Sequence, residues 1–159
     1  MDFNPTMASV DIYTDGSALG NPGPGGYAAV LLSGDKRLEI SGGFALTTNN
    51  RMELKAVVEA LLVLKGQDHF IRLYSDSKYV IDAFAQNWLP TWQKRDWKNV
   101  KNPDLWQALL PLTNLHHIEW CWVKGHADVP ENERCDVLAK AAASASSLPP
   151  DTGYSSPNT

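Results

Sequence analysis

Cysteine is scarce in this sequence, and long apolar runs are absent from it. Two of the 159 residues, Cys121 and Cys135, are cysteines, which is too few for a disulfide framework. No segment approaches the roughly 18 to 20 consecutive apolar residues of a membrane-spanning helix. The first residues, 1–9, also lack the basic and apolar segments of a secretory signal. These absences predict a cytoplasmic protein that has no membrane partner.

Motifs of three common kinds of site are missing as well. The glycine-rich segment 20–26 is not followed by Gly-Lys-Ser/Thr and contains no G-x-G-x-x-G pattern, so neither nucleotide-binding fingerprint fits. No G-x-S-x-G sequence marks a serine nucleophile. Cys121, His126 and Cys135 lack zinc-finger spacing, so a structural zinc site is not expected.

The overall composition is that of an ordinary globular protein. Hydrophobic residues make up 43% of the chain and charged residues 20%, which excludes a mostly disordered protein. The length suits one domain, 1–159, that can bury a core without disulfides or metal. We expect the core at about 8–146 and a flexible tail at 147–159, where proline and serine are frequent. We also expect a monomer.

Positive charge is in the minority, but it is locally concentrated. The net charge of −4 argues mildly against a nucleic-acid-binding protein, because such domains are often basic. Segment 86–102 nevertheless contains four basic residues and only one acidic residue, together with three of the six tryptophans. These are Lys94, Arg95, Lys98 and Lys101, with Asp96, and Trp88, Trp92 and Trp97. We name this segment the basic stretch.

Hydrophobic periodicity predicts a mixed α/β fold. Alternating or apolar runs predict strands, and apolar residues three and four apart predict helices. Three closely spaced strands form an antiparallel meander, and a right-handed crossover can place the fourth strand beside the first. The predicted strands are 9–14, 27–32, 38–46, 70–75 and 118–123, and the predicted helices are 51–65, 77–86, 104–115 and 130–146.

Four carboxylates and one histidine fall at the same edge of this predicted sheet. Asp15 and Asp76 follow the first and fourth strands, and Glu53 begins the helix that descends from that edge. His126 and Asp136 follow the fifth strand. Active sites of open α/β sheets lie at such an edge. Unpaired carboxylates repel one another, so the cluster predicts a cation, and oxygen ligands favour Mg²⁺ or Mn²⁺ over zinc.

Each carboxylate also has a purely structural explanation. Asp15 precedes a glycine, as in an ordinary turn, and Asp76 lies at a predicted helix N-terminus. Glu53 can close a capping box with Asn50, although it also lies on the apolar stripe of its helix. Asp136 can pair with a lysine four residues later. Four such coincidences at one edge are much less probable than one shared site.

Six ordered segments carry a resemblance to a known family. They are Tyr13-Thr-Asp-Gly-Ser17, Gly20-Asn-Pro-Gly-Pro-Gly-Gly-Tyr27, Thr47-Thr-Asn-Asn-Arg-Met-Glu-Leu54, Ser75-Asp-Ser-Lys-Tyr-Val80, Trp122-Val-Lys-Gly-His126 and Glu131-Asn-Glu-Arg-Cys-Asp136. Together they resemble the bacterial type 1 ribonucleases H, the ribonuclease HI family. The match spans nearly the whole chain. It implies an RNase H-like α/β fold with a mixed five-stranded sheet of order 3-2-1-4-5, strand 2 antiparallel, flanked by helices.

The resemblance also implies an activity and its residues. It implies endonucleolytic hydrolysis of the RNA strand of an RNA–DNA hybrid, with two Mg²⁺ ions, replaceable by Mn²⁺, on Asp15, Glu53, Asp76 and Asp136. His126 matches a histidine credited with proton transfer or product release. Implied hybrid contacts are Asn21, Asn49 and Asn50 in the minor groove, Thr48 at a DNA phosphate, Lys78, and the handle residues Trp88, Trp92, Lys94, Arg95, Trp97, Lys98 and Lys101.

Two positions depart from the family pattern, and two other functions remain open. Lys78 stands where a glutamine is usual, and the interval from Trp97-Lys98 to Leu105-Trp106 is several residues shorter and less lysine-rich than in other bacterial members. The alternatives are a binding-only module of this fold and a DNA-directed nuclease of the same superfamily. A protein that only binds the hybrid would gain nothing from four acids that face a polyanion. Cleavage of hybrid but not of duplex DNA would exclude the DNA-directed nuclease.

Overall fold

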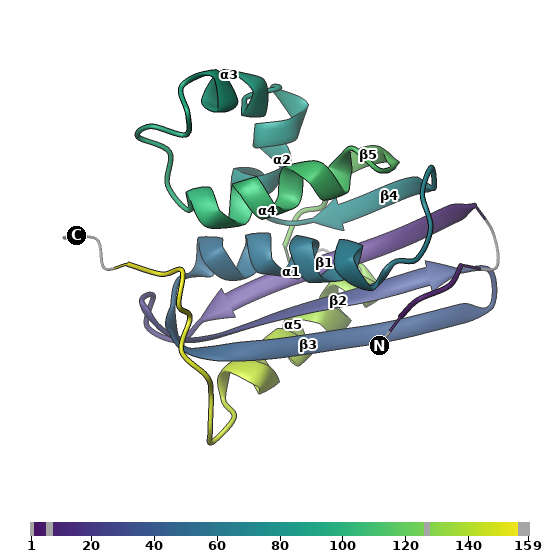
Figure 1. The fold of residues 1–159 in the computed structure, drawn as a ribbon. Helices are drawn as coiled ribbons and strands as arrows, with labels where there is room; N and C mark the ends of the chain where they lie inside the picture. The colour runs from purple at the N-terminus through teal and green to yellow at the C-terminus, as the bar shows by residue number, and fades with distance from the viewer. Residues whose placement is uncertain (1, 6–7, 126–127, 156–159) are drawn as a thin grey trace.

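The computed structural model describes residues 2–5, 8–125 and 128–155, which form a mixed sheet with helices on both faces (Figure 1). The strands are β1 (Ser9–Ala18), β2 (Gly23–Ser33), β3 (Lys36–Thr47), β4 (Phe70–Ser75) and β5 (His117–Trp122). Their order is β3-β2-β1-β4-β5. β2 is antiparallel to β1 and β3, whereas β4 is parallel to β1 and β5. The predicted fold class and strand order are therefore confirmed.

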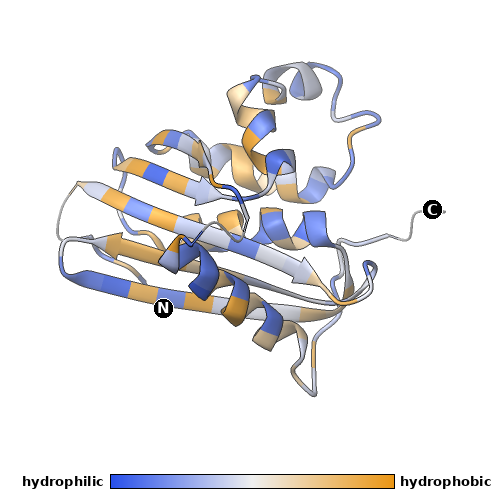
Figure 2. Ribbon diagram, turned by 180° about the vertical axis from the view of Figure 1, so that it is seen from behind, coloured by the Kyte–Doolittle hydropathy of each residue, from blue (hydrophilic) through white to orange (hydrophobic). Residues whose placement is uncertain are grey.

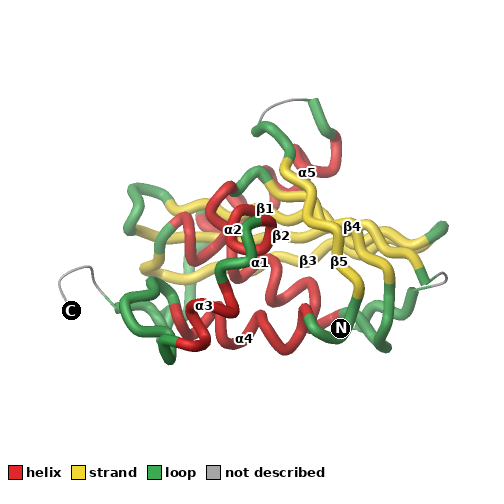
Figure 3. The backbone as a smooth tube through the Cα atoms, turned by 90° about the horizontal axis from the view of Figure 1, so that it is seen from above, coloured by secondary structure: helices red, strands yellow, loops and turns green. Residues whose placement is uncertain are grey.

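The helices divide between the two faces of the sheet. They are α1 (Asn49–Val63), α2 (Lys78–Ala85), α3 (Leu89–Lys94), α4 (Pro103–Thr113) and α5 (Pro130–Ala143). Seen from above, α5 lies on one side of the strands, and α1, α3 and α4 lie on the other (Figure 3). In the described part of the chain no helix is both long and apolar enough to cross a bilayer.

The hairpin of β1 and β2 is longer than predicted. The predicted strands 9–14 and 27–32 leave a glycine- and proline-rich connection between them, but Asp15 pairs with Ala28 and the ladder continues to Ala18 and Gly25. Gly20, with a φ of 78°, serves the chain reversal between the two strands, whereas Gly16 serves close packing. A Cβ on Gly16 would collide with the backbone of α1, so glycine alone lets β1 and α1 approach this closely.

Local side chains set the helix starts. The hydroxyl of Thr48 accepts a hydrogen bond from Arg51 N (3.2 Å) and caps α1, so the predicted capping box from Asn50 to Glu53 is wrong. The hydroxyl of Ser77 caps α2 in the same way, through Val80 N (3.3 Å). The six-residue α3 was not predicted, because it is too short to show a helical period.

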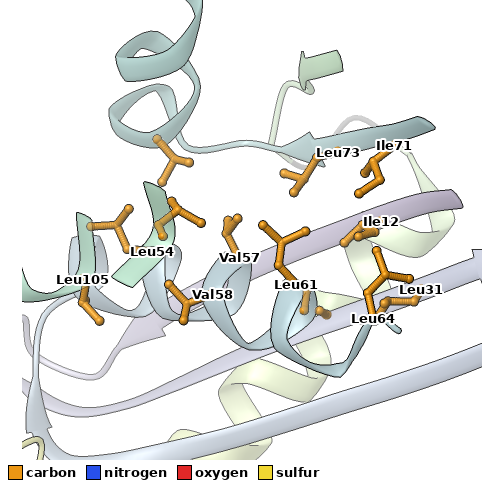
Figure 4. Packing of buried hydrophobic residues seen from close by; sticks show 14 of the residues in the cluster. Ile12, Leu31, Leu54, Val57, Val58, Leu61, Leu64, Ile71, Leu73 and Leu105 are labelled. Atoms are coloured by element: carbon orange, nitrogen blue, oxygen red, sulfur yellow. The ribbon is translucent and has the colours of Figure 1, made fainter. Parts of the chain in front are cut away.

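Two apolar layers fix the helices against the sheet. Leu54, Val57 and Leu61 of α1 pack on Ile12 and Leu73 of the sheet (Figure 4). On the other face, small buried residues let α5 lie close to β2: Ala28, Val30, Cys135 and Ala139. Apolar and polar residues alternate along the strands, as expected for a sheet whose faces differ in burial (Figure 2).

Residues 148–155, within the expected flexible tail 147–159, are hydrogen-bonded to the body of the protein. They return across β3 toward α1 and are drawn in yellow in Figure 1. Pro149 O accepts a hydrogen bond from Ala45 N (2.8 Å), and Asp151 Oδ2 pairs with Arg51 Nε (2.8 Å). A buried ion pair 100 residues apart in sequence leaves no local pattern, so composition alone suggested disorder.

Candidate active site

Three carboxylates meet where two parallel strands end. Asp15 lies in β1, Asp76 directly follows β4, and Glu53 lies in α1. One carboxylate oxygen of each lies within 4.8 Å of those of the other two. Asp15 and Glu53 are buried, with exposed fractions of 4% and 9%, and Asp76 is half-buried. The predicted convergence of these three acids at one sheet edge is confirmed.

Backbone packing brings two of these acids together. The parallel pairing of β1 and β4 aligns their carboxyl ends, which places Asp15 beside Asp76. Gly16 lies directly under the α1 backbone at Met52 and Glu53, so the helix delivers Glu53 to the end of β1. Gly16 N also donates a hydrogen bond to Asp15 Oδ1 (2.9 Å), which orients that carboxylate.

The electrostatics of this cluster demand a cation. Burial, and then the charge of Asp76, raises the pKa of Asp15 to about 7. Burial, and then Asp15 and Asp76, raises the pKa of Glu53 well above its usual value. Within the described residues, Glu53 Oε2 is buried and has no hydrogen-bond partner. A divalent ion with oxygen ligands would satisfy this atom and relieve the repulsion, so the donor set fits a hard metal ion.

Asp136 lies on the rim of the same cleft and is paired with a lysine of its own helix. It lines the cleft together with Asp15, Glu53 and Asp76. Its Oδ2 forms an ion pair with Lys140 Nζ (3.0 Å), which is the structural alternative that the sequence suggested. Among the described residues, the close group of acids contains three members and does not include Asp136.

His126 lies outside the described residues, but the chain just before it is placed. A Cβ added to Gly125 would lie 3.3 Å from Asp76 Oδ2. The loop after β5 therefore passes directly over the carboxylate cluster, as the direction of the strands predicted.

A second cleft adjoins the acidic one. Its volume is about 580 Å³. The two clefts share Asn49 and Asn50, so they lie side by side. Hydrogen bonds fix the polar wall of the second cleft: Asn21 Oδ1 accepts from Asn49 N (2.9 Å), and Asn49 Oδ1 accepts from Ala18 N (2.6 Å). The second cleft is lined by Asn21, Pro22, Thr48, Asn49, Asn50, Val100, Lys101, Asn102, Pro103, Tyr154 and Ser155.

Comparisons with known proteins agree with this geometry. The family model for RNase H matches residues 7–144. The chain belongs to the ribonuclease H family. It is 56% identical over 154 residues to a ribonuclease H of Nitratidesulfovibrio vulgaris (strain DSM 19637 / Miyazaki F), covering 94% of this chain and 98% of that protein. It is 55% identical over 153 residues to a ribonuclease H of Aeromonas salmonicida (strain A449), covering 93% and 98%.

Solved structures give the same family. The chain is similar to LC9-RNase H1, described as a type 1 RNase H with the type 2 active-site motif, with a TM-score of 0.76 and 34% identity. That similarity covers 85% of this chain and 72% of the other.

Lys78, the unusual residue at the third carboxylate, is held by an aromatic ring. Its ammonium lies 4.7 Å from the ring centroid of Trp122, within cation–π range. Trp122 Nε1 in turn donates to Asp76 O (3.3 Å). Lys78 also lines the acidic cleft. The ammonium of Lys78 therefore places a positive charge at the edge of the ribonuclease H carboxylates. No local sequence pattern indicates that Trp122 holds this ammonium.

The basic stretch presents its cations to solvent and turns much of its aromatic surface inward. The residues Lys94, Arg95, Lys98 and Lys101 are exposed. Trp92 packs edge-on against the buried Trp106, with ring centroids 5.2 Å apart, and Trp97 is half-buried. Trp88 is the more open ring, with 38% exposed. Trp92 and Trp97 therefore attach the stretch to the core and leave only part of their faces for a ligand.

Proposed function

We propose that this chain is a Mg²⁺-dependent endoribonuclease that hydrolyses the RNA strand of RNA–DNA hybrids and leaves 5′-phosphate and 3′-hydroxyl ends. Membership of the ribonuclease H family supports the activity. The observation that carries the proposal is the cluster of Asp15, Glu53 and Asp76, whose carboxylate oxygens lie within 4.8 Å of one another. A cluster of like charges beside a groove is an arrangement for metal ions and a polyanionic substrate, not for binding that substrate alone.

Asp15, Glu53 and Asp76 would hold the metal, and Asp136 would join them by leaving Lys140. Divalent ions bound there would activate the attacking water and stabilise the leaving 3′-oxygen. Lys78, held by Trp122, would contact a phosphate next to the one that is cut. We assign His126, which follows the loop over Asp76, to proton transfer or product release, since a neutral imidazole titrates near pH 6.5.

The remaining expected contacts recognise the hybrid. Asn21, Thr48, Asn49 and Asn50 line the second cleft and would face the minor groove and a DNA phosphate. The exposed cations of the basic stretch would bind further phosphates, which supplies affinity without sequence preference. Hybrid shape and the 2′-hydroxyl would then distinguish RNA from DNA. We further propose that the protein is cytoplasmic and acts as a monomer. Light scattering of the purified chain tests the oligomeric state.

Cleavage of defined substrates tests the proposed function. End-labelled RNA–DNA hybrid, duplex DNA and duplex RNA of one sequence are incubated with Mg²⁺, with Mn²⁺ or with EDTA. We expect metal-dependent cuts in the RNA strand of the hybrid only. Binding of the hybrid without cleavage would indicate a binding-only module, and cleavage of duplex DNA would indicate a DNA-directed nuclease.

A further inference from the structure

The last described residues, 148–155, are tied down by hydrogen bonds at two points; we name them the C-terminal strap. They lie beyond residue 144, where the match to the family model ends. Pro149 O accepts from Ala45 N (2.8 Å). The carboxylate of Asp151 accepts from Arg51 Nε (2.8 Å), from Arg51 Nη2 (3.0 Å) and from Thr47 Oγ1 (2.7 Å). The strap is thus attached both to the edge strand β3 and to the first turn of α1.

The anchor of the strap is a buried charge network. Arg51 is 2% exposed, and it also donates to both carboxylate oxygens of Asp104 in α4 (2.9 and 2.8 Å). Burial alone would raise the pKa of Asp151, but hydrogen bonds from Arg51 and Thr47 lower it below its usual value. Asp151 therefore stays ionised and bound at neutral pH, and a paired buried charge of this kind fixes geometry.

A tight turn then directs the next side chain. Tyr154 N donates to Asp151 O (3.1 Å) and closes a turn of four residues. Within it, a Cβ on Gly153 would collide with Asp104 Oδ2 and lie 2.7 Å from Arg51 Nη2, so any larger residue would displace these side chains of the network. The turn places Tyr154 in the lining of the second cleft, together with Thr48 and Asn49.

The chemistry of this cleft suits a sugar–phosphate backbone. Its described lining contains amides, hydroxyls and the ammonium of Lys101, and no carboxylate. It adjoins the acidic cleft at Asn49 and Asn50, so a strand bound over the carboxylates would have this cleft next to its path. A phenol can donate a hydrogen bond to a phosphate oxygen while its ring packs on a sugar.

We infer that the C-terminal strap forms one wall of the nucleic-acid groove and that Tyr154 contacts the sugar–phosphate backbone of the bound hybrid. This inference rests on the proposed function. It makes Tyr154 a substrate-binding residue, and it makes Asp151 and Gly153 positioning residues that act through the turn.

Binding and turnover of Tyr154 variants test the inference. Affinity for a fluorescent hybrid is measured in EDTA, where cleavage does not occur, and kcat and KM are measured with Mg²⁺. Tyr154→Ala should raise Kd about three- to tenfold, the loss of one hydrogen bond and its packing, with kcat changed less than about twofold. Tyr154→Phe keeps the ring and should show a smaller rise. Because the phenol is neutral, the salt dependence of Kd should keep its slope.

A matched control and a positioning variant complete the test. Thr152→Ala alters the same strap at an exposed residue that does not line the cleft, so its Kd should equal that of the parent chain. Asp151→Asn should raise Kd like Tyr154→Ala but also lower Tm, whereas Tyr154→Phe should leave Tm unchanged.

Two outcomes would overturn the inference, and they are distinguishable. If the parent chain cuts the hybrid while Tyr154→Ala binds it equally well, the strap does not contact substrate and the proposed function stands. If the parent chain neither binds nor cuts the hybrid, the proposed function fails and the inference fails with it.

Discussion

Two buried charges lie two residues apart in α1 and have opposite surroundings. Arg51 is 2% exposed and is paired with Asp104 and Asp151. Glu53 is 9% exposed and faces Asp15 and Asp76, both of its own sign. The first turns of one helix therefore carry a satisfied ionic network on one side and an unsatisfied one on the other.

The difference separates what holds the protein together from what the protein does. A buried ion whose partners are all present fixes the elements that supply them, here α1, α4 and the C-terminal strap. A cluster of buried like charges weakens the folded state and is retained for a cation that comes from outside. Changing one residue on each side should thus have opposite effects on stability.

The largest effect is expected from Asp15→Asn. It removes a metal ligand, and loss of several kcal/mol of transition-state stabilisation lowers kcat by at least about 10³-fold. It also relieves repulsion within the cluster, so Tm in EDTA should rise. Both are measured on one preparation, by hybrid cleavage and by thermal unfolding.

The control for Asp15→Asn is Asp35→Asn, which changes the same charge at an exposed turn between β2 and β3. It should leave activity and Tm unchanged. An Asp15→Asn variant that keeps substantial Mg²⁺-dependent cleavage would remove Asp15 from the metal site.

Replacing Arg51 should act in the opposite direction on stability. Arg51→Met leaves Asp151 without its partner in a buried position, which costs about 3 to 5 kcal/mol and lowers Tm by about 10 °C. Kd for the hybrid should rise as well, because the strap loses its anchor. Lys55→Met is the matched control on the same helix, since Lys55 forms a partly exposed pair with Glu59 (3.0 Å) and lies 5.8 Å from the ring centroid of Phe44, contacts that contribute little to stability. A Tm equal to that of the parent chain would show that the network does not stabilise the fold.

The two networks should also respond oppositely to pH. The pKa of Asp15 is raised to about 7 in the folded state, against 3.8 when unfolded, so the folded state binds more protons between these values. Without metal, stability should therefore fall as pH rises from about 4 to 7, by on the order of 5 °C in Tm. Asp151, whose pKa is lowered, contributes stability that is lost only as pH falls below about 4.

Metal and substitution sharpen this pH test. Mg²⁺ binds the ionised carboxylates, so it should reduce the fall in Tm between pH 4 and 7 and bind more tightly toward the upper end of this range. Asp15→Asn should remove most of the fall. A Tm in EDTA that rises steadily over this pH range would contradict the raised pKa of Asp15.

The same comparison explains what could be predicted from the sequence. Strand 70–75 was predicted with its observed bounds, because apolar residues alternate along it. The directions of the predicted strands were enough to predict that Asp15, Glu53 and Asp76 meet at one edge of the sheet. Arg51 and Asp151 could not be paired, because they lie 100 residues apart and neither has a local pattern.

Glycine misled the prediction at the active site itself. Gly16 and its neighbours indicated a loop, whereas in the structure the missing side chain is what lets α1 approach β1. Composition likewise suggested a disordered tail, although Gly153 and Asp151 make it part of the groove wall. In both places the residue type reports a tertiary contact, which a single sequence does not display.

The smallest effects are expected where charge is neither buried nor crowded, in the basic stretch. Lys94, Arg95, Lys98 and Lys101 are exposed and lie outside the acidic cluster, so they should bind ground and transition states alike. Each change to alanine should raise KM modestly, leave kcat within about twofold, and reduce the salt slope of log K by about 0.9 where the cation contacts a phosphate. Lys36→Ala, an equal charge change at the exposed first residue of β3, should leave the slope unchanged. An unchanged salt slope together with a large fall in kcat would instead mean that the basic stretch organises the carboxylate site. These charges would then act in catalysis and not only in binding.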